Sequence, residues 1–272
     1  MIKKHLTCEA GLCRSGGQDI SFAQQRWSKD ARGNDYLNTE ANAWHKLRHP
    51  NILEFLGTIN LPCNRVGLVA PFKEINNALS YIKRFSEFQR RNIILGIAKG
   101  LRYIHHEDVI HGDLRLKSIL FDDDGTPRIS DFGLSRLIDH TADTTNLQYG
   151  SWSYAAPEII IKATQDDSNI PRTAKWTTKA TDVYAFSITA AEIFMGKPYR
   201  LNELNAYKLV VDKNVRPLKS DVNSPRYFSL LEACWEKKPE KRLLIEQVEK
   251  RLEYVNHAGE LQNGALNDGP VH

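Results

Sequence analysis

The sequence lacks any hydrophobic run long enough to cross a membrane, because no stretch approaches about 18 consecutive apolar residues. The potential core of a signal peptide that would follow Lys3 and Lys4 is interrupted by polar and charged residues. These residues are Thr7, Glu9 and Arg14. We therefore expect a protein that neither spans a membrane nor enters the secretory pathway.

A strong excess of one charge is also absent. The 37 lysine and arginine residues exceed the 33 aspartate and glutamate residues by four, and no long run of like charges concentrates this excess. The composition therefore gives no sign of a surface for nucleic acid or for a membrane, and neither partner is expected.

Cysteine is scarce, with four residues in a chain of 272. The cysteines are scattered, and the nearest approach to a metal-binding group, His5 with Cys8 and Cys13, lacks a fourth zinc ligand. A disulfide framework and a zinc site are therefore not expected. A reducing compartment, the cytoplasm or the nucleus, fits best.

What the chain does contain is the composition of an ordinary globular protein, with 41% apolar and 26% charged residues. At about 150 residues per domain, its length corresponds to one two-lobed unit or to two small domains. The sequence contains no internal repeat and no low-complexity tract.

The pattern of apolar residues changes along the chain from mixed strand and helix to mostly helix. Residues 36 to 48 carry apolar residues at helical spacing. A capping box formed by Ser86 and Gln89 predicts the start of another helix. Residues 178 to 195 are apolar nearly all round and are followed by Gly196, which predicts a helix buried in the middle of a helical lobe.

The segment 111–133 is the most informative part of the sequence. Two short β-type runs at 119–121 and 128–130 are joined by the turn-rich link 122–127, which predicts a hairpin.

The pairing across this hairpin decides which polar groups meet at its edge. If Phe121 faces Arg128, the register places Ser118 opposite the residue three positions after Arg128. That residue is Asp131, and Asp113 arrives at the same edge from the preceding loop. Two carboxylates and a hydroxyl oxygen suit a hard cation such as Mg²⁺, although two solvated loop aspartates would give the same local pattern.

Three short motifs resemble the signature set of protein kinases in their order and spacing. They are His111-Gly112-Asp113-Leu114, Asp131-Phe132-Gly133 and Ala156-Pro157-Glu158. The segment 40–53 resembles the kinase helix that carries the ion-pairing glutamate, together with the link after that helix. The segment 181–186 resembles the start of the central helix of the large lobe. Cys234-Trp235 with Pro239 and Arg242 is similar to the tyrosine-kinase-like branch, as is Gly112. The resemblance covers about residues 40 to 254.

The resemblance implies an α+β, protein kinase-like fold of two lobes. The expected divisions are an incomplete, β-rich small lobe at 1–70, a hinge at 71–77, a large helical lobe at 78–255 and a flexible tail at 256–272. The oligomeric state does not follow from the sequence.

The resemblance also implies ATP and Mg²⁺ as cofactors and a protein substrate or a regulated protein partner. Asp113 would accept the proton of a substrate Ser or Thr hydroxyl, and Asp131 would hold Mg²⁺ across the β- and γ-phosphates. Ser118 stands where the family has the asparagine that binds a second metal ion. Arg115 and Ser151, whose hydroxyl would bridge toward Asp113, complete the catalytic set.

Other site residues follow from the same resemblance. The nucleotide-binding residues are Ala70 as gatekeeper, Pro71, Lys73 and Leu120. A hinge needs a carbonyl at 71 and an N–H at 73, so Pro71 is tolerated. The structural or regulatory residues are Glu40, His111, Phe132, Glu158, Asp182 and Arg242, with Glu158 and Arg242 expected to form an ion pair. Gly112 replaces the arginine that in many kinases binds an activation-loop phosphate, so activation by that route is not expected.

The chain departs from the family in its first 40 residues. The glycine-rich loop and the lysine that pairs with Glu40 are both missing. The lysine strand should be 19–27, where the candidate positions are Ala23, Gln24 and Gln25. Arg26 or Lys29 could replace the lysine, or both could be solvated charges at a strand end.

Two functions of different class therefore stay open. Each lost electrostatic group typically costs about 10²–10³ in turnover, which is too much for a signalling enzyme if two are missing. This favours a pseudokinase that acts in signalling as a scaffold or regulator over a weak Ser/Thr protein kinase. If the gene model is cut short at its 5′ end, an upstream segment encoding Gly-x-Gly-x-x-Gly would supply the missing glycine-rich loop. Such a segment would favour the active enzyme.

Overall fold

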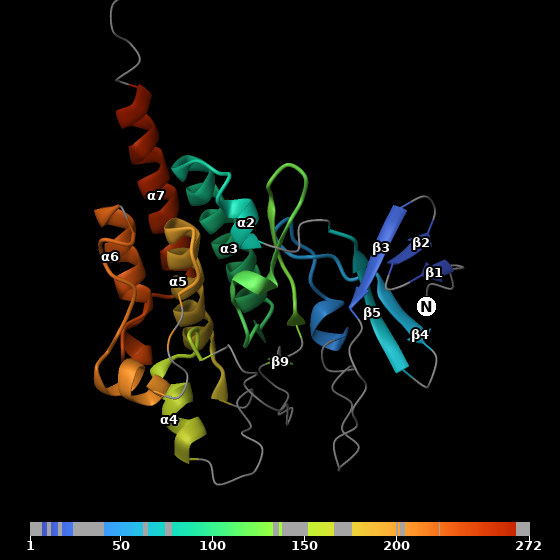
Figure 1. Cartoon of the computed structure of the whole chain (residues 1–272), viewed down its shortest axis with the longest axis horizontal. Coiled ribbons are helices and arrows are strands. Elements are labelled where there is room, and N and C mark those ends of the chain that lie inside the picture. Colours follow the sequence, from blue (N-terminus) through green and yellow to red (C-terminus); the bar gives the residue numbers. More distant parts are fainter. Residues whose placement is uncertain are drawn as a thin grey trace, which may run out of the picture.

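The computed structural model describes most of the chain from residue 41 onward and three strands before it. The described residues are 7–9, 12–15, 18–23, 41–61, 65–73, 78–132, 136–137, 152–165, 176–199, 201, 205–222 and 224–264. A β-sheet lies on one side and most helices lie on the other, so the molecule has the two lobes that the resemblance predicts (Figure 1). None of the described helices combines the length and the apolar character needed to cross a membrane.

The small lobe is built on a five-stranded antiparallel sheet with the strand order β1-β2-β3-β5-β4. The strands are β1 (Thr7–Glu9), β2 (Leu12–Ser15), β3 (Gln18–Ala23), β4 (Gly57–Leu61) and β5 (Arg65–Pro71). Glu9 pairs with Leu12, so only two residues connect β1 to β2. The predicted strand 19–27 corresponds to β3, which ends at Ala23.

The large lobe is helical, with α5 at its centre. Its α-helices are α2 (Ala78–Ile82), α3 (Glu87–His106), α4 (Pro157–Gln165), α5 (Lys179–Met195), α6 (Pro225–Cys234) and α7 (Ile245–Gly264). Short turns of other helix types are η1 (Leu116–Ser118), η5 (Tyr207–Asp212) and η6 (Pro239–Lys241). Every residue of α5 from 181 to 193 is buried, as its apolar sequence predicts.

The predicted helix boundaries are confirmed where the sequence carries a capping signal. Ser86 and Gln89 form the capping box of α3, in which the Gln89 amide N–H donates to Ser86 Oγ and the Ser86 amide N–H donates to Gln89 Oε1. Gly196 ends α5 with a φ of 61°, a left-handed conformation that favours glycine.

Two short strand pairs frame the loop that precedes the candidate site. β6 (Val109–Ile110) pairs with β9 (Arg136–Leu137), and β7 (Ile119–Phe121) pairs with β8 (Pro127–Ile129). The second pair is the predicted hairpin.

The predicted register of this hairpin is wrong by one residue. Phe121 pairs with Pro127, so Ser118 lies opposite Ser130 rather than Asp131, and the Ser130 amide N–H donates to the Ser118 carbonyl at 2.8 Å. The cause is a turn that closes earlier than expected, because the amide N–H of Asp122 donates to the carbonyl of Thr126. Pro127 therefore joins the strand as its first residue, a position that tolerates proline.

The β7–β8 hairpin is also joined to the segment that leads into the small lobe. The Ile129 amide N–H donates to the Asn51 carbonyl at 2.9 Å, and the Leu53 amide N–H donates to the Ile129 carbonyl at 2.9 Å. Helix α3 packs closely under this junction because it carries two glycines. A Cβ atom added at Gly96 would lie 2.7 Å from Pro127 Cγ, and one added at Gly100 would lie 2.9 Å from the Asn51 carbonyl oxygen.

Helix α7 extends into the segment that was predicted to be a flexible tail. Helix α7 continues through residue 256, where the tail was expected to start, and ends at Gly264. The hydroxyl of Tyr227 on α6 donates to Asn256 Oδ1, so a side chain contact holds this part of α7 to the lobe. Residues 265–272 lie outside the described residues.

Candidate active site

A column of four aromatic rings connects the two lobes behind the candidate site. Phe132 is fully buried and lies between Trp44 and His111, with ring centroids 5.6 Å and 5.2 Å apart. Phe55 also packs against Trp44, with ring centroids 5.2 Å apart. Because these rings come from four separate segments, the column fixes the position of Phe132 and of the residue before it, Asp131.

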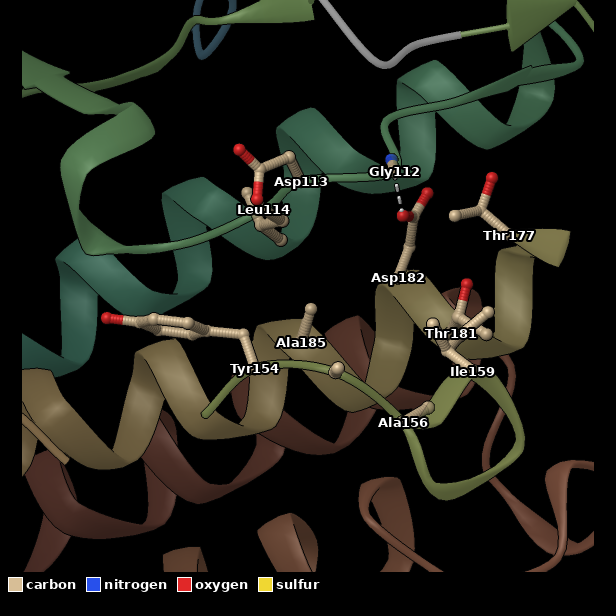
Figure 2. A pocket seen from close by; sticks show the side chains of 11 residues that line it. Gly112, Asp113, Leu114, Tyr154, Ala156, Ile159, Thr177, Thr181, Asp182 and Ala185 are labelled. Carbon is tan, nitrogen blue, oxygen red and sulfur yellow. Dashed lines mark hydrogen bonds between the residues drawn. The ribbon is translucent and has the colours of Figure 1, made fainter. Parts of the chain in front are cut away.

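The loop that carries Asp113 is hydrogen-bonded to the side chain of Asp182 on α5. The Asp182 carboxylate accepts hydrogen bonds from the backbone N–H groups of His111 and Gly112, each at 2.9 Å, and Figure 2 shows the bond to Gly112. The ring of His105 contacts the same carboxylate at 2.9 Å. Asp182 is 1% exposed and satisfied by three donors, so it anchors the loop.

His111 is fixed from both sides. Its Nε2 atom lies 2.9 Å from the Ser130 carbonyl, and its Nδ1 atom accepts the Asp113 amide N–H at 3.3 Å. A carbonyl can only accept, so the network assigns the proton of a neutral ring to Nε2. Gly112 has a φ of 82°, which a residue with a side chain rarely adopts.

Asp113 and Arg115 form an ion pair within the loop. Arg115 Nη2 lies 3.1 Å from Asp113 Oδ2, and the two side chains are 15% and 14% exposed. The guanidinium therefore places a positive charge beside the group that would act as the base.

Ser118, the proposed metal ligand, closes the same loop on itself. Its hydroxyl donates to the Arg115 carbonyl at 2.7 Å and accepts the Arg115 amide N–H at 3.0 Å. The Asp113 carbonyl lies 3.4 Å away, and the Ser118 side chain is fully buried. In this arrangement the hydroxyl positions the loop, and its role as a metal ligand stays a prediction.

Asp131 has a φ of 62°, an uncommon conformation for a residue other than glycine. Desolvation raises the pKa of its carboxyl group, and the nearby His111 and Arg115 oppose this shift. A cation at this carboxylate would offset the desolvation, so Asp131 fits the role of a Mg²⁺ ligand. The described residues contain no cluster of three or more His, Cys, Asp or Glu side chains, so phosphate and water oxygens would complete the coordination.

The predicted nucleotide-binding residues lie at the end of β5 and on β7. Ala70 is buried, Pro71 is the last residue of β5, and Leu120 is half-buried. Lys73 follows in the segment that leads to α2, and its Nζ atom lies 2.5 Å from Asp122 Oδ1.

Strand β3 supplies no lysine beside these residues. In its register with β5, Ser21 lies opposite Ala70 and Ala23 lies opposite Leu68. Residue 23, one of the predicted lysine positions, is therefore an alanine next to the gatekeeper strand. The other positions considered for the missing ion pair (Gln24, Gln25, Arg26, Lys29 and Glu40) lie outside the described residues, as does Ser151.

The structure brings Glu158 and Arg242 together. The Arg242 guanidinium donates to both carboxylate oxygens of Glu158 at 2.7 Å, and its Nη1 atom also donates to the Ala180 carbonyl at 3.0 Å. The side chain of Arg242 is fully buried, and its guanidinium lies 5.2 Å from the ring centre of Tyr184. This pair joins the start of α4 to the segment after α6.

The sequence analysis missed a second buried carboxylate near the site. Glu192 on α5 accepts the Tyr154 hydroxyl, 2.9 and 2.8 Å from its two oxygens, and the Tyr199 amide N–H at 2.8 Å. Burial raises the pKa of Glu192 to about 7. The signal in the sequence was a single charged residue, this glutamate, within the mostly apolar run 183–193.

Tyr154 also lines a pocket beside Asp113 (Figure 2). The pocket is partly open to solvent and lies between the loop at 112–114, the segment 154–156 and the first turns of α5. The proposed base therefore borders a space formed jointly by the loop and the segment that precedes α4.

Comparison with known proteins agrees with this geometry. The family model described as "Protein kinase domain" matches residues 12–252. Serine/threonine-protein kinase 12 of Arabidopsis thaliana is 31% identical over 223 residues, which cover 78% of this chain and 46% of the relative. Serine/threonine-protein kinase STY46 of the same plant is 28% identical over 225 residues, covering 79% of this chain and 37% of the relative. The hormonally up-regulated neu tumor-associated kinase homolog of Xenopus tropicalis is 29% identical over 246 residues, covering 87% and 34%.

The chain spans less than half the length of each of these curated relatives. The family model, in contrast, covers nearly all of the two-lobed fold, including the three signature motifs. This chain belongs to the protein kinase family.

Proposed function

We propose that this protein kinase domain transfers phosphate to Ser or Thr hydroxyls poorly or not at all. In this proposal its folded large lobe acts in signalling as a scaffold or regulator of a protein partner, in the cytoplasm or nucleus. ATP and Mg²⁺ are the cofactors if any activity remains.

The observation that carries this proposal is the composition of the first three strands. β3 contains no lysine, and its register places Ala23 near the gatekeeper strand. The sequence from the start of β1 to the end of β2, residues 7–15, contains one glycine, Gly11, and therefore no Gly-x-Gly-x-x-Gly motif. Both groups that would grip the phosphates are therefore missing from the described sheet.

The hydrogen bonds between the Ser118 hydroxyl and the loop backbone support the same proposal. The side chain of Ser118 is fully buried and its oxygen already accepts the Arg115 amide N–H, so a metal ion could reach that oxygen only if the loop rearranged. Kinases turn over at about 1–100 s⁻¹, and each missing electrostatic group costs about 10²–10³. Losing two such groups would reduce turnover by about 10⁴-fold or more if the effects add.

The experiment compares phosphate incorporation by the wild type, Asp113→Asn and Asp131→Asn. Purified chain is incubated with radiolabelled Mg·ATP and a generic Ser/Thr protein substrate. We expect equal, background-level incorporation in all three proteins. Incorporation by the wild type that exceeds both variants by about 10²-fold or more, as a positioned general base provides, would refute the proposal.

A second candidate is an active but slow Ser/Thr kinase in which Arg26 or Lys29 replaces the missing lysine. It is favoured by Asp131, which keeps a left-handed φ that costs about 1–2 kcal/mol, a strain that is common at functional sites. In this case Ser118→Asn should raise the activity by about 10²-fold if metal binding is the main defect. Activity abolished by Arg26→Met or Lys29→Met would identify the substitute cation.

A further inference from the structure

One carboxylate in the large lobe holds the segment that links the two lobes. Asp122 lies in the turn after β7, and its Oδ1 atom is 2.5 Å from Lys73 Nζ. Its Oδ2 atom accepts hydrogen bonds from Arg128 Nε at 2.8 Å and Arg128 Nη2 at 2.5 Å. Lys73 follows the last residue of β5 by two positions, before α2 begins at Ala78.

This three-residue cluster is mostly withdrawn from water. The side chains of Lys73, Asp122 and Arg128 are 21%, 18% and 28% exposed. Desolvation raises the pKa of Asp122, but the hydrogen bonds from Arg128 and Lys73 outweigh it and hold the pKa below its ordinary value. The carboxylate therefore stays charged at neutral pH and holds both cations.

The position of the cluster connects it to the nucleotide-binding residues. Leu120 lies on β7, and Asp122 follows it by two residues, directly after the strand ends at Phe121. The residue after Arg128 is Ile129, and its amide N–H donates to the carbonyl of Asn51, which lies in the small lobe before β4. The β7–β8 hairpin thus contacts the segment that joins the lobes, through Asp122 and Lys73, and the small lobe itself, through Asn51.

We propose that Asp122 is a positioning residue for the adenine pocket, because it fixes the 71–73 segment against the strand that carries Leu120. The inference rests on the proposed function only in taking 71–73 and Leu120 as the edge and the floor of a nucleotide site. It does not depend on the groups that grip phosphate.

The probe is therefore adenosine, which has no phosphate and no charge. Its dissociation constant is measured by calorimetry for the wild type, Asp122→Asn and the matched control Asp124→Asn. Asp124 is an exposed carboxylate in the same turn that accepts the Thr126 amide N–H and forms no ion pair with Lys73. We expect Asp122→Asn to weaken adenosine binding by about fivefold, the effect of one partly exposed charge-assisted contact, and Asp124→Asn to match the wild type.

The dependence of adenosine affinity on salt concentration gives a second measurement. It would not change if Asp122 only stabilised the fold. The Debye length falls from about 10 Å at 0.1 M to about 3 Å at 1 M ionic strength. Because adenosine is neutral, a salt-dependent affinity would report the protein charges alone. We expect salt to weaken binding by the wild type and by Asp124→Asn, but not by Asp122→Asn or Lys73→Met, and the double variant should add nothing to either single one.

The proposal is overturned if the wild type does not bind adenosine, or if Asp122→Asn lowers the melting temperature without changing the dissociation constant. Failure of the proposed function has a different signature. It would appear as phosphate transfer, or as Mg²⁺-dependent binding of ATP much tighter than that of adenosine, and would leave the comparison of the adenosine affinities intact.

Discussion

Replacement of Glu192 by glutamine tests how a buried carboxyl group makes the stability of the large lobe depend on pH. Glu192 is 1% exposed, and within the described part of the chain its carboxylate is contacted by neutral donors, the Tyr154 hydroxyl and the Tyr199 amide N–H. Burial is the leading cause that raises its pKa from 4.5 to about 7, and these hydrogen bonds oppose the shift. The Glu192→Gln variant removes the charge and keeps the shape.

The magnitude follows from the pKa difference. A pKa of about 7 in the folded state against 4.5 in the unfolded state corresponds to about 3 kcal/mol, since one unit is worth about 1.4 kcal/mol. Because the folded pKa is the higher one, the folded state binds the proton more tightly. The stabilisation is complete below the unfolded value of 4.5 and is lost as the pH rises through about 7.

The assay is denaturant unfolding of the wild type, Glu192→Gln and the control Glu246→Gln between about pH 5 and pH 8. Glu246 is exposed on α7, so its replacement should leave the pH profile of the wild type unchanged. We expect the free energy of unfolding of the wild type to fall relative to that of Glu192→Gln by about 2–3 kcal/mol over this range. An unsatisfied amide N–H₂ group in the variant shifts its curve by a constant amount and leaves the slope unaffected. A difference that stays constant within about 0.5 kcal/mol would refute the reasoning.

Three further outcomes are expected. Arg242→Ala should lower the free energy of unfolding by about 3–5 kcal/mol because it leaves Glu158 without its guanidinium, whereas the exposed Lys241→Ala should cost less than about 1 kcal/mol in the same denaturant titration. Gly96→Ala should cost about 1–3 kcal/mol through its contact with the hairpin, and Lys99→Ala on the same helix should cost less. Millimolar Mg·ATP should raise the melting temperature of the wild type no more than millimolar adenosine does, and a clear Mg²⁺-dependent rise at micromolar ATP would contradict the proposed loss of phosphate binding.

The family and the main helices could be predicted because their signals are local. The motifs at 111–114, 131–133 and 156–158 have fixed spacing, and a capping box involves residues three apart. The relation between Glu158 and Arg242, which are 84 residues apart, was available only through the resemblance to a known family.

The register of the β7–β8 hairpin could not be predicted because it depends on where the turn closes. The link was expected to include Pro127, since proline is typical of turns. The hydrogen bond from Asp122 to Thr126 closes the turn one residue earlier, and one residue is enough to change every pair across the strands. For this reason Ser118 lies opposite Ser130 and not opposite Asp131, as the sequence had predicted.

The role of Ser118 and the contact between Tyr154 and Glu192 lay beyond sequence reasoning for a different cause. A hydroxyl can turn toward a metal ion or toward its own backbone, and only the loop conformation decides between them. Tyr154 and Glu192 are 38 residues apart, and no local pattern predicts that α5 and the segment before α4 place them side by side.

The two glycines of α3 have a consequence for how the large lobe folds. Each glycine inside a helix costs about 0.8–1.0 kcal/mol relative to alanine, so the middle of α3 is intrinsically a weak helix. The same positions allow the close approach of Asn51 and Pro127. The central turns of α3 therefore gain their stability only when the hairpin and the segment at 51–53 have docked. Helix formation and docking should occur in one cooperative step, and hydrogen exchange should protect the amides of 96–100 and of Ile129 together.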